Sequence, residues 1–478
     1  MITKFTKIVA TIGPATNTLE GIKALYEGGM NAARLNFSHG SYDYFGKVID
    51  NIRKIDEKIC IILDTRGPEI RTNDFKGEGV NLEVGQKIFI ENSTESSDEK
   101  TLRLNYSYLG KIHHGSIIHI DDGLITARVV SNDEIIEAEI LNGGFLGNKK
   151  GVTFKGHNVC LPCLTDKDKE DILFGIKKDV DYVAVSYVRQ ASDVNELRDF
   201  LKKNNSNAGI IAKIEHGSAV ENIDEIIEAA DGVMIARGDL GVELELEKVP
   251  LIQRELINKC NKQGRPVIVA TQMLESMNNS PKPTRAEVSD VANAILQGAD
   301  AVMLSSETAK GKYPNESVRV MRQIASVFDA QVENVFAESL YEQDEVYTNE
   351  VSLFVTKAAY LASKSIKTAA ILTPTESGYT ARKVARFKPK CPVLAITRNR
   401  TVLRQLQISW GVFPEYEPAV YTSVENYIND LAMLGMQRGF LAEDDVFVIT
   451  MGHKLHQPGT TNLLEIYNIS EIIERMNN

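Results

Sequence analysis

The sequence has few aromatic residues and no long apolar run. Phe, Trp and Tyr make up 7% of its 478 residues, with a single tryptophan, which argues against an aromatic groove for sugars or peptides. No apolar run approaches the ~18 residues of a transmembrane helix, so we expect no membrane partner. The N-terminal residues Met1–Phe5 lead directly into a strand-like run and show no apolar signal-peptide segment. A cytoplasmic location is therefore predicted.

The cysteines and the charge balance exclude further classes of protein. The five cysteines are odd in number and scattered, which is typical of a reducing compartment. Lys and Arg number 54 against 65 Asp and Glu, a formal net charge of −11. No segment is strongly basic, so nucleic acid is not expected as a partner. A small anionic substrate stays compatible with this charge, because local cations can override the net value.

Eight short β-branched runs alternate with amphipathic segments such as Asn222–Ala229 and Thr284–Gln297. This alternation predicts βα units and a parallel sheet. Eight such units are typical of a TIM (β/α)8 barrel. The predicted strands are Lys7–Ile12, Ala32–Phe37, Ile59–Asp64, Tyr182–Ser186, Ile210–Ile214, Val233–Ala236, Val267–Thr271 and Ala301–Leu304.

An insertion interrupts the barrel pattern between the third and fourth predicted strands. Residues 70–159 hold short alternating segments separated by turn signals, which indicates a small inserted β-barrel domain. Its tethers at Gly67–Pro68 and Leu161–Pro162 suit a hinge. We interpret this domain as a lid over the barrel mouth.

The βα pattern restarts after residue 340. A helix is predicted at Val351–Ser363, followed by buried parallel strands at Ala369–Leu372, Val393–Ile396 and Val446–Thr450. The chain is thus predicted to be an α/β protein of three domains. These are a discontinuous catalytic barrel at 1–69 and 160–340, the lid at 70–159, and a C-terminal regulatory α/β domain with a mostly parallel sheet at 341–478.

Polar side chains follow the predicted strands at the ends that face the active site of such a barrel. Alternation places Arg34, Asn36 and Ser38 on one face of the second strand, and Lys213 and Glu215 on one face of the fifth. Any one of them could simply solvate a strand end. Isolated buried charges are costly, so polar ends on six strands imply a ligand or metal between them. The other members are Asp64-Thr65-Arg66, Arg237-Gly238-Asp239, Thr271-Gln272 and Ser305-Ser306-Glu307.

These residue types suit phosphoryl transfer assisted by magnesium. Glu215 and Asp239 could hold Mg²⁺, which usually takes one or two carboxylates plus substrate oxygens and water, and no His-rich zinc set accompanies them. Lys213 and Arg34 supply positive charge for a phosphoryl group. Backbone N–H groups near Gly238 could bind a carboxylate or phosphate. Asn36, Ser38, Asp64 and Thr65 are all oxygen donors, as a hard cation requires.

Seven segments of the chain resemble motifs of the pyruvate kinase family. They occur in order along the whole chain, and several are long and specific. The resemblance implies transfer of a phosphoryl group from phosphoenolpyruvate to ADP, giving pyruvate and ATP as the last step of glycolysis. It also implies Mg²⁺ and K⁺ as cofactors and a homotetramer. The segments are Lys7–Pro14, Ala33–Gly40, Leu63–Arg71, Ala212–Glu215, Ile235–Gly241, Ala270–Met277 and Met303–Ala309.

Matching motif positions carry the family's residue roles. Lys213 would stabilise the transferring phosphoryl group and the enolate, Arg34 would hold the phosphate, and Thr271 would lie near the proton path to pyruvate. Glu215 and Asp239 would ligate Mg²⁺. The substrate carboxylate would be held by Gly238, Asp239 and Thr271. K⁺ would be bound by Asn36, Ser38, Asp64 and Thr65. The nucleotide would be contacted by Asn36, His39, Arg71 and Lys167.

The resemblance also implies a potassium requirement linked to Glu69. Family members with Glu at this position tend to depend on K⁺, whereas Lys there places an ammonium near the cation site. A carboxylate leaves the site more negative and favours a bound cation. The alternative is that Glu69 is only a solvated residue of the hinge.

A candidate regulatory loop, Thr373–Thr380, follows a predicted strand and opens a helix. Hydroxyls and free N–H groups there form an anion site, although N-capping alone is the alternative. In the family this loop holds the phosphate of an allosteric effector, with Gly452–Thr461 as its partner loop. Glu376 stands where members regulated by fructose bisphosphate often carry Lys, so we expect another phosphorylated effector or none. The candidate residues are Thr373, Thr375, Ser377, Gly378 and Thr380.

Other readings of the sequence carry less weight. Cys160 and Cys163 form a CxxC without the further ligands of a zinc site or a thioredoxin-like context. Thr165 with Asp166 and Asp168 is typical of a helix N-cap. A carbon–carbon lyase or aldolase acting on pyruvate-like enolates is the rival enzyme, and an inactive metabolite sensor is the third reading. The lid, the oxygen set and the nucleotide-side cations favour the kinase.

Overall fold

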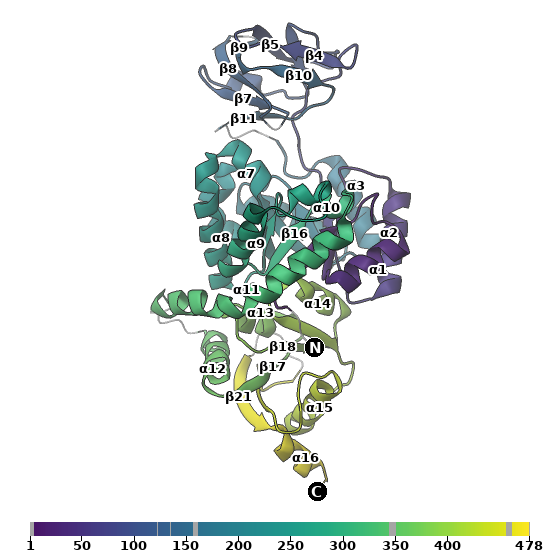
Figure 1. Ribbon diagram of the computed structural model, residues 1–478, viewed down its shortest axis with the longest axis vertical. Coiled ribbons are helices and arrows are strands. Elements are labelled where there is room, and N and C mark those ends of the chain that lie inside the picture. Colours follow the sequence, from purple (N-terminus) through teal and green to yellow (C-terminus); the bar gives the residue numbers. More distant parts are fainter. Residues whose placement is uncertain are drawn as a thin grey trace.

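The computed structural model describes residues 4–121, 123–133, 135–155, 161–343, 350–455 and 461–477. Three parts of the chain follow one another along the longest axis of the molecule (Figure 1). A βα barrel lies in the middle, a β-rich part lies beyond one of its ends, and an α/β part lies against the other. Within the described ranges, no helix is long and apolar enough to cross a membrane.

The barrel is a closed ring of eight parallel strands, as the sequence predicts. Each strand pairs with its neighbours in chain order, and β1 pairs with β16 to close the ring. The strands are buried almost throughout, because helices cover their outer face and side chains fill the interior. They are β1 (Lys7–Thr11), β2 (Ala32–Asn36), β3 (Cys60–Asp64), β12 (Tyr182–Val185), β13 (Gly209–Ile214), β14 (Gly232–Ala236), β15 (Val267–Ala270) and β16 (Ala301–Leu304).

Helices connect the barrel strands, and several begin at side-chain caps. Thr165 caps α3 in a capping box with Asp168, which confirms the predicted N-cap. Thr284 and Glu287 form the same arrangement at α9. The helices are α1 (Leu19–Gly28), α2 (Tyr42–Ile55), α3 (Asp166–Lys177), α4 (Ala191–Lys203), α5 (Gly217–Glu221), α6 (Ile223–Ala229), α7 (Arg237–Glu243), α8 (Val249–Gln263), α9 (Arg285–Leu296), α10 (Ser306–Ala309) and α11 (Pro314–Gln343).

The inserted part is all β, as predicted, and has its own apolar core. Alternate residues of its strands are buried, for example Ile136, Ala138 and Ile140 in β9. Its described strands form a sheet of order β11-β7-β8-β9-β5-β6 and a pair β10-β4, rather than the single closed barrel that we expected. They are β4 (Gly79–Leu82), β5 (Lys87–Asn92), β6 (Thr101–Leu104), β7 (Ile117–Ile120), β8 (Ile125–Asn132), β9 (Ile136–Asn142), β10 (Gly144–Gly147) and β11 (Val152–Phe154).

The C-terminal part contains a five-stranded sheet of order β19-β18-β17-β20-β21. Four strands are parallel and β21 is antiparallel, so the predicted mostly parallel sheet is confirmed. Sequence reasoning missed β19 and β21. The elements are α12 (Val351–Ser365), β17 (Thr368–Pro374), α13 (Tyr379–Ala385), β18 (Val393–Thr397), α14 (Arg400–Gln405), β19 (Val412–Tyr416), α15 (Val424–Gln437), β20 (Val446–Gly452), β21 (Thr461–Asn468) and α16 (Ile469–Asn477).

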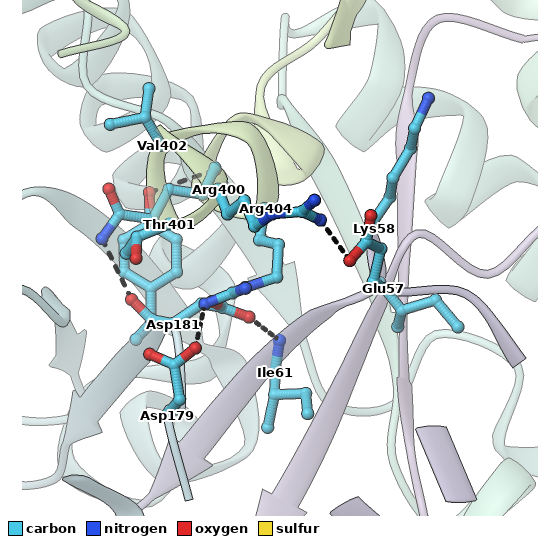
Figure 2. A network of polar contacts seen from close by, with 12 residues as sticks. Glu57, Lys58, Ile61, Asp179, Asp181, Arg400, Thr401, Val402 and Arg404 are labelled. Atoms are coloured by element: carbon cyan, nitrogen blue, oxygen red, sulfur yellow. Dashed lines mark hydrogen bonds and ion pairs between the residues drawn. The ribbon is translucent and has the colours of Figure 1, made fainter. Parts of the chain in front are cut away.

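Helix α14 of the C-terminal part is joined to the base of the barrel through Asp181 (Figure 2). This fully buried carboxylate precedes β12 and accepts from Arg404 Nε at 2.5 Å, from Arg53 Nη2 at 3.0 Å and from the Ile61 N–H of β3 at 2.8 Å. Arg404 also binds Asp179 at 2.5 Å. The network therefore ties α14 to the starting ends of two barrel strands, β3 and β12.

Arg404→Met should destabilise this junction, because Asp181 then stays buried with only one of its two cations. Breaking a buried ion pair costs about 3–5 kcal/mol, and we expect the lower end since Arg53 remains. Urea unfolding can be followed by the fluorescence of Trp410, the only tryptophan of the sequence. Trp410 is buried at the junction, where its backbone N–H donates to Asp300.

Arg400→Met is the matched control for this measurement. Arg400 pairs with Glu57 across the same junction, but 49% and 61% of the two side chains are exposed. Exposed pairs contribute only about 0–1 kcal/mol, so this variant should stay close to the wild type. Equal shifts of the urea midpoint in the two variants would contradict the importance of Asp181.

Candidate active site

A cavity of about 300 Å³ lies between the barrel mouth and the inserted β part. Its walls combine carboxylates that follow barrel strands with cations from the tether and the inserted part. A groove with these two walls can hold an anionic ligand together with a cation, since both signs of charge face the same space. The charged lining residues include Glu69, Arg71, Lys150, Glu215, Asp239 and Glu243.

The ammonium group of Lys213 lies at the end of β13, beside this cavity, and is almost fully buried. Its Nζ donates to Glu215 Oε1 at 2.8 Å and to Ser186 Oγ at 2.7 Å, and it lies 3.1 Å from Asp64 Oδ1. Burial works against the charged form, but the carboxylates of Asp64 and Glu215 outweigh it and raise the pKa of Lys213. Lys213 therefore stays cationic at physiological pH.

Asp64 connects Lys213 with the second cation of the site. Its Oδ2 accepts from Arg34 Nε at 2.5 Å, and Arg34 Nη1 donates to Thr11 Oγ1 at 3.0 Å. Burial would raise the pKa of Asp64, but Arg34 and Lys213 reverse the shift and lower it. The structure thus brings two predicted cations onto one buried carboxylate.

The oxygen donors predicted to bind a monovalent cation gather at the ends of β2 and β3. Asn36 and Asp64 are register partners across these neighbouring strands. Asn36 Oδ1 accepts from the Ser38 N–H at 3.1 Å, and Thr65, 2% exposed, follows Asp64 directly. The four predicted oxygen donors therefore lie close together at the ends of two adjacent strands.

Thr271 is held against Gly238 in an unusual backbone conformation. Its Oγ1 accepts from the Gly238 N–H at 2.8 Å, and its φ of 67° lies in the left-handed region. A Cβ on residue 238 would meet Thr271 Oγ1 at 3.4 Å, an ordinary van der Waals contact, so this approach does not by itself require glycine. Arg237 donates to the Thr271 carbonyl at 2.8 Å and also pairs with Asp290. These two contacts hold the backbone at Thr271 in place.

Lys167, His39 and Glu307 belong neither to the cavity lining nor to the charged cluster around Lys213. Lys167 donates to Tyr42 OH and to Asp171 Oδ1, both at 2.6 Å, on the outer surface of α3. His39 is exposed just after β2. Glu307 accepts from two backbone N–H groups, those of Leu274 and Ser305, so this strand end serves the structure of a loop.

Lys150 and Ser186 are among the side chains of the site that sequence reasoning missed. Lys150 of the inserted part lines the cavity and pairs with Asp121 at 2.9 Å; its neighbour Lys149 and the following glycine give no local signal of a ligand site. Ser186 was predicted only as the last residue of a strand, yet its hydroxyl contacts Lys213. A spacing argument does not find such contacts, because they join segments far apart in the sequence.

Glu243 is a further carboxylate of the cavity lining. Its Oε2 lies 3.4 Å from His216 Nε2. Burial raises the pKa of Glu243 to about 7, with Lys155 opposing and Asp239 adding to the shift. Glu69, also in the lining, is paired with Arg71 at 2.5 Å and with Arg66 at 3.4 Å, so it is not the merely solvated residue of the alternative reading.

The regulatory loop and the CxxC are described only in part. Thr375 Oγ1 accepts from the Gly378 N–H at 3.0 Å, and Thr380 Oγ1 contacts Thr461 Oγ1 at 2.7 Å. Glu376 is paired with Arg398 at 3.3 Å. Residues 456–460 of the partner loop and Cys160 lie outside the described residues. Cys163 is buried and forms no disulfide, and the same holds for the other described cysteines.

Comparison with known proteins matches both halves of the chain. The family model for the pyruvate kinase barrel domain matches residues 3–318, and that for the pyruvate kinase alpha/beta domain matches residues 354–467. Pyruvate kinases from Sporosarcina psychrophila and Geobacillus stearothermophilus are each 45% identical to the chain, and one from Staphylococcus aureus strain MRSA252 is 43% identical. Each match covers 98% of this chain and 81% of the relative.

Lys213→Met removes the cation that faces two buried carboxylates, and its effect on stability should depend on pH. In the wild type the lowered pKa of Asp64 gives a stabilising contribution that is present above the unfolded value of about 4 and lost as the pH falls through the folded value. In the variant, the uncompensated carboxyls bind protons more readily. We therefore expect the loss of thermal stability to be larger at about pH 8 than at about pH 5.

The control for the pH experiment is Lys248→Met. Lys248 pairs with Glu245 on the surface, where 60% and 51% of the side chains are exposed, so its removal should shift the melting temperature little at either pH. A deficit of Lys213→Met that is equal at both pH values would contradict the electrostatic account.

Proposed function

The chain belongs to the pyruvate kinase family, and we propose that it performs the family reaction with the residues gathered at the barrel mouth. In this reaction a phosphoryl group passes from phosphoenolpyruvate to ADP, which yields pyruvate and ATP. The observation that carries the proposal is the buried ammonium of Lys213, held between Asp64 and Glu215 beside a cavity with walls of both charges.

Phosphoryl transfer needs positioning and stabilisation of charge more than covalent help from the protein. Arg34 holds the phosphate of phosphoenolpyruvate, and Lys213 faces the oxygens on which negative charge develops. When the phosphoryl group leaves, the remaining enolate is stabilised by the same ammonium. The enolate carbon then takes up a proton near Thr271, while Gly238, Asp239 and Thr271 hold the carboxylate end of the substrate.

The donor set at the cavity fits a magnesium ion. Glu215 and Asp239 follow neighbouring strands, β13 and β14, and both line the cavity. No cluster of three metal-ligating side chains occurs among the described residues, and Mg²⁺ commonly completes its shell with substrate oxygens and water. Bound there, Mg²⁺ would neutralise phosphoryl oxygens during transfer.

A potassium ion fits the second donor set, Asn36, Ser38, Asp64 and Thr65. These oxygens lie at the ends of β2 and β3, beside the cations that face the phosphoryl group. Their single carboxylate already has two cationic partners, so the charge of the set suits a monovalent ion better than a divalent one. A bound K⁺ would add one positive charge next to the reacting phosphate.

The nucleotide would lie on the side of the cavity nearest the inserted part. Arg71 and Lys150 line that side and offer two cations to the phosphates of ADP. Asn36, His39 and Lys167 stay predicted contacts from the resemblance. Movement of the inserted part about Gly67–Pro68 would close the cavity around the nucleotide, as its role as a lid requires.

Several further assignments complete the proposal. The domain limits are those predicted from the sequence: 1–69 with 160–340, 70–159, and 341–478. A homotetramer follows from the family resemblance, and a cytoplasmic location suits described cysteines that form no disulfide. The effector loop at Thr373–Thr380 stays a prediction. The negative charge of Glu376 was the reason to expect an effector other than fructose bisphosphate. Arg398 pairs with this carboxylate and partly neutralises it, which weakens that reason.

The reaction and its magnesium ligands can be tested together. Pyruvate formation from phosphoenolpyruvate and ADP is measured in a coupled assay while magnesium is titrated. Glu215→Gln and Asp239→Asn should each require much more Mg²⁺ for half-maximal activity, because an amide is a weaker ligand for this ion than a carboxylate. Their melting temperatures without metal should stay near that of the wild type.

The matched control in this titration is Glu247→Gln, an exposed carboxylate on the surface turn after α7. Its magnesium requirement should equal that of the wild type. Unchanged requirements in both cavity variants would point to other ligands. A wild-type protein that forms no pyruvate from phosphoenolpyruvate would refute the proposed function. That result would favour the alternative functions of a carbon–carbon lyase or an inactive metabolite sensor.

Potassium dependence is expected because Glu69 supplies no cation near the oxygen donor set. Activity should collapse in buffer balanced with a bulky organic cation and return with potassium chloride. Glu69→Lys should restore part of the activity without potassium, since its ammonium can substitute for the ion. Glu69→Gln, which loses the negative charge but adds no cation, should not. Full wild-type activity without potassium would refute this assignment.

A further inference from the structure

The hydroxyl of Ser186 lies between Lys213 and the backbone of Thr65. Ser186 follows β12, and its side chain is buried. Its Oγ accepts from Lys213 Nζ at 2.7 Å and donates to the Thr65 carbonyl at 2.7 Å. The Ser186 N–H donates in turn to Thr65 Oγ1 at 3.2 Å. Two hydrogen bonds therefore anchor Ser186 to Thr65, and a third reaches the ammonium.

These bonds give the contact a fixed direction. A hydroxyl has one proton, and that of Ser186 points to the Thr65 carbonyl. Only its lone pairs then face Lys213, so the hydroxyl acts as an acceptor at a position set by the backbone. Thr65 follows β3 and Ser186 follows the adjacent β12, which makes this acceptor part of the barrel wall.

The three acceptors around Lys213 differ in their access to the cavity. The ammonium of Lys213 donates a hydrogen bond to Ser186 Oγ at 2.7 Å, and it forms ion pairs with Asp64 Oδ1 at 3.1 Å and Glu215 Oε1 at 2.8 Å. Of these acceptors only Glu215 lines the cavity. A phosphoryl oxygen arriving from the cavity would therefore compete for the donor that faces Glu215. The hydrogen bond to Ser186 and the ion pair with Asp64 would stay in place.

We infer that Ser186 is a positioning residue that acts through Lys213, an inference that rests on the proposed function. Asp64 and Glu215 keep Lys213 charged, whereas Ser186 determines where the ammonium points once Glu215 no longer holds it. Small errors in aiming a charged group at a reacting centre can reduce the rate by about 100-fold. Ser186 also links Lys213 to Thr65, one of the proposed potassium ligands.

The test compares Ser186→Ala with Ser186→Cys, which keeps nearly the side-chain volume but is a weak acceptor. We expect kcat to fall by roughly 10- to 100-fold in both variants. The KM for phosphoenolpyruvate should stay within about threefold of the wild type, because the loss concerns the transition state. The potassium concentration for half-maximal activity should also shift, since the Thr65 carbonyl loses its hydroxyl donor.

Ser317→Ala is the matched control. Ser317 is a fully buried serine of α11 whose Oγ donates to the Tyr313 carbonyl at 2.8 Å, far from Lys213 in the sequence and outside the cavity. The Ser317→Ala variant loses the hydrogen bond from a buried serine hydroxyl to a backbone carbonyl, as Ser186→Ala does. Its kcat should stay near the wild-type value. Circular dichroism and thermal unfolding establish that each variant is folded.

The outcomes separate this inference from the proposed function. A folded Ser186 variant with kcat within about threefold of the wild type would overturn the inference, as would a loss confined to KM. If Ser186→Ala does not fold, the kcat and KM of Ser186→Cys are judged by the same criteria. A wild-type protein without phosphoenolpyruvate-dependent activity would refute the proposed function instead.

Discussion

A charged ammonium buried at the mouth of the barrel is unfavourable unless other groups compensate it, and the rest of the site is arranged around that requirement. Lys213 is compensated by Asp64 from β3 and Glu215 from its own strand. Asp64 in turn holds Arg34 of β2. Removal of any one of these groups leaves its buried partners with less compensating charge, so the cluster acts as a unit.

Closure of the barrel makes this arrangement possible. Strands β3, β12 and β13 are neighbours in the ring. Asp64 is the last residue of β3, Ser186 directly follows β12, and Lys213 is the penultimate residue of β13. Parallel strands all end at the same side of the ring, so residues separated by more than a hundred positions come within hydrogen-bond distance. The Ser186 hydroxyl, which follows the middle strand, links the Thr65 carbonyl on one side to the Lys213 ammonium on the other.

The same strands are held at their opposite ends by the C-terminal part. Asp181 and Ile61, at the starts of β12 and β3, share the network that includes Arg404 of α14. Helix α14 follows Arg398, which pairs with Glu376 of the candidate regulatory loop. Helix α14 therefore connects that loop with the network at the starts of β12 and β3, whose other ends carry Ser186 and Asp64. Figure 2 shows the Arg404 and Asp181 side of this connection.

Sequence alone determined the elements whose signal is local. The eight barrel strands were predicted within a residue or two, because buried parallel strands are continuous β-branched runs, and polar residues at their ends marked Lys213, Glu215 and Asp239. The tertiary structure decided what depends on long-range packing: the antiparallel β21, the pairing of Glu69 with Arg71, the outer position of Lys167 and the cavity position of Lys150. It also decided the role of Ser186, since the acceptor that an ammonium finds depends on which strands close next to each other, and closure is a property of the whole ring.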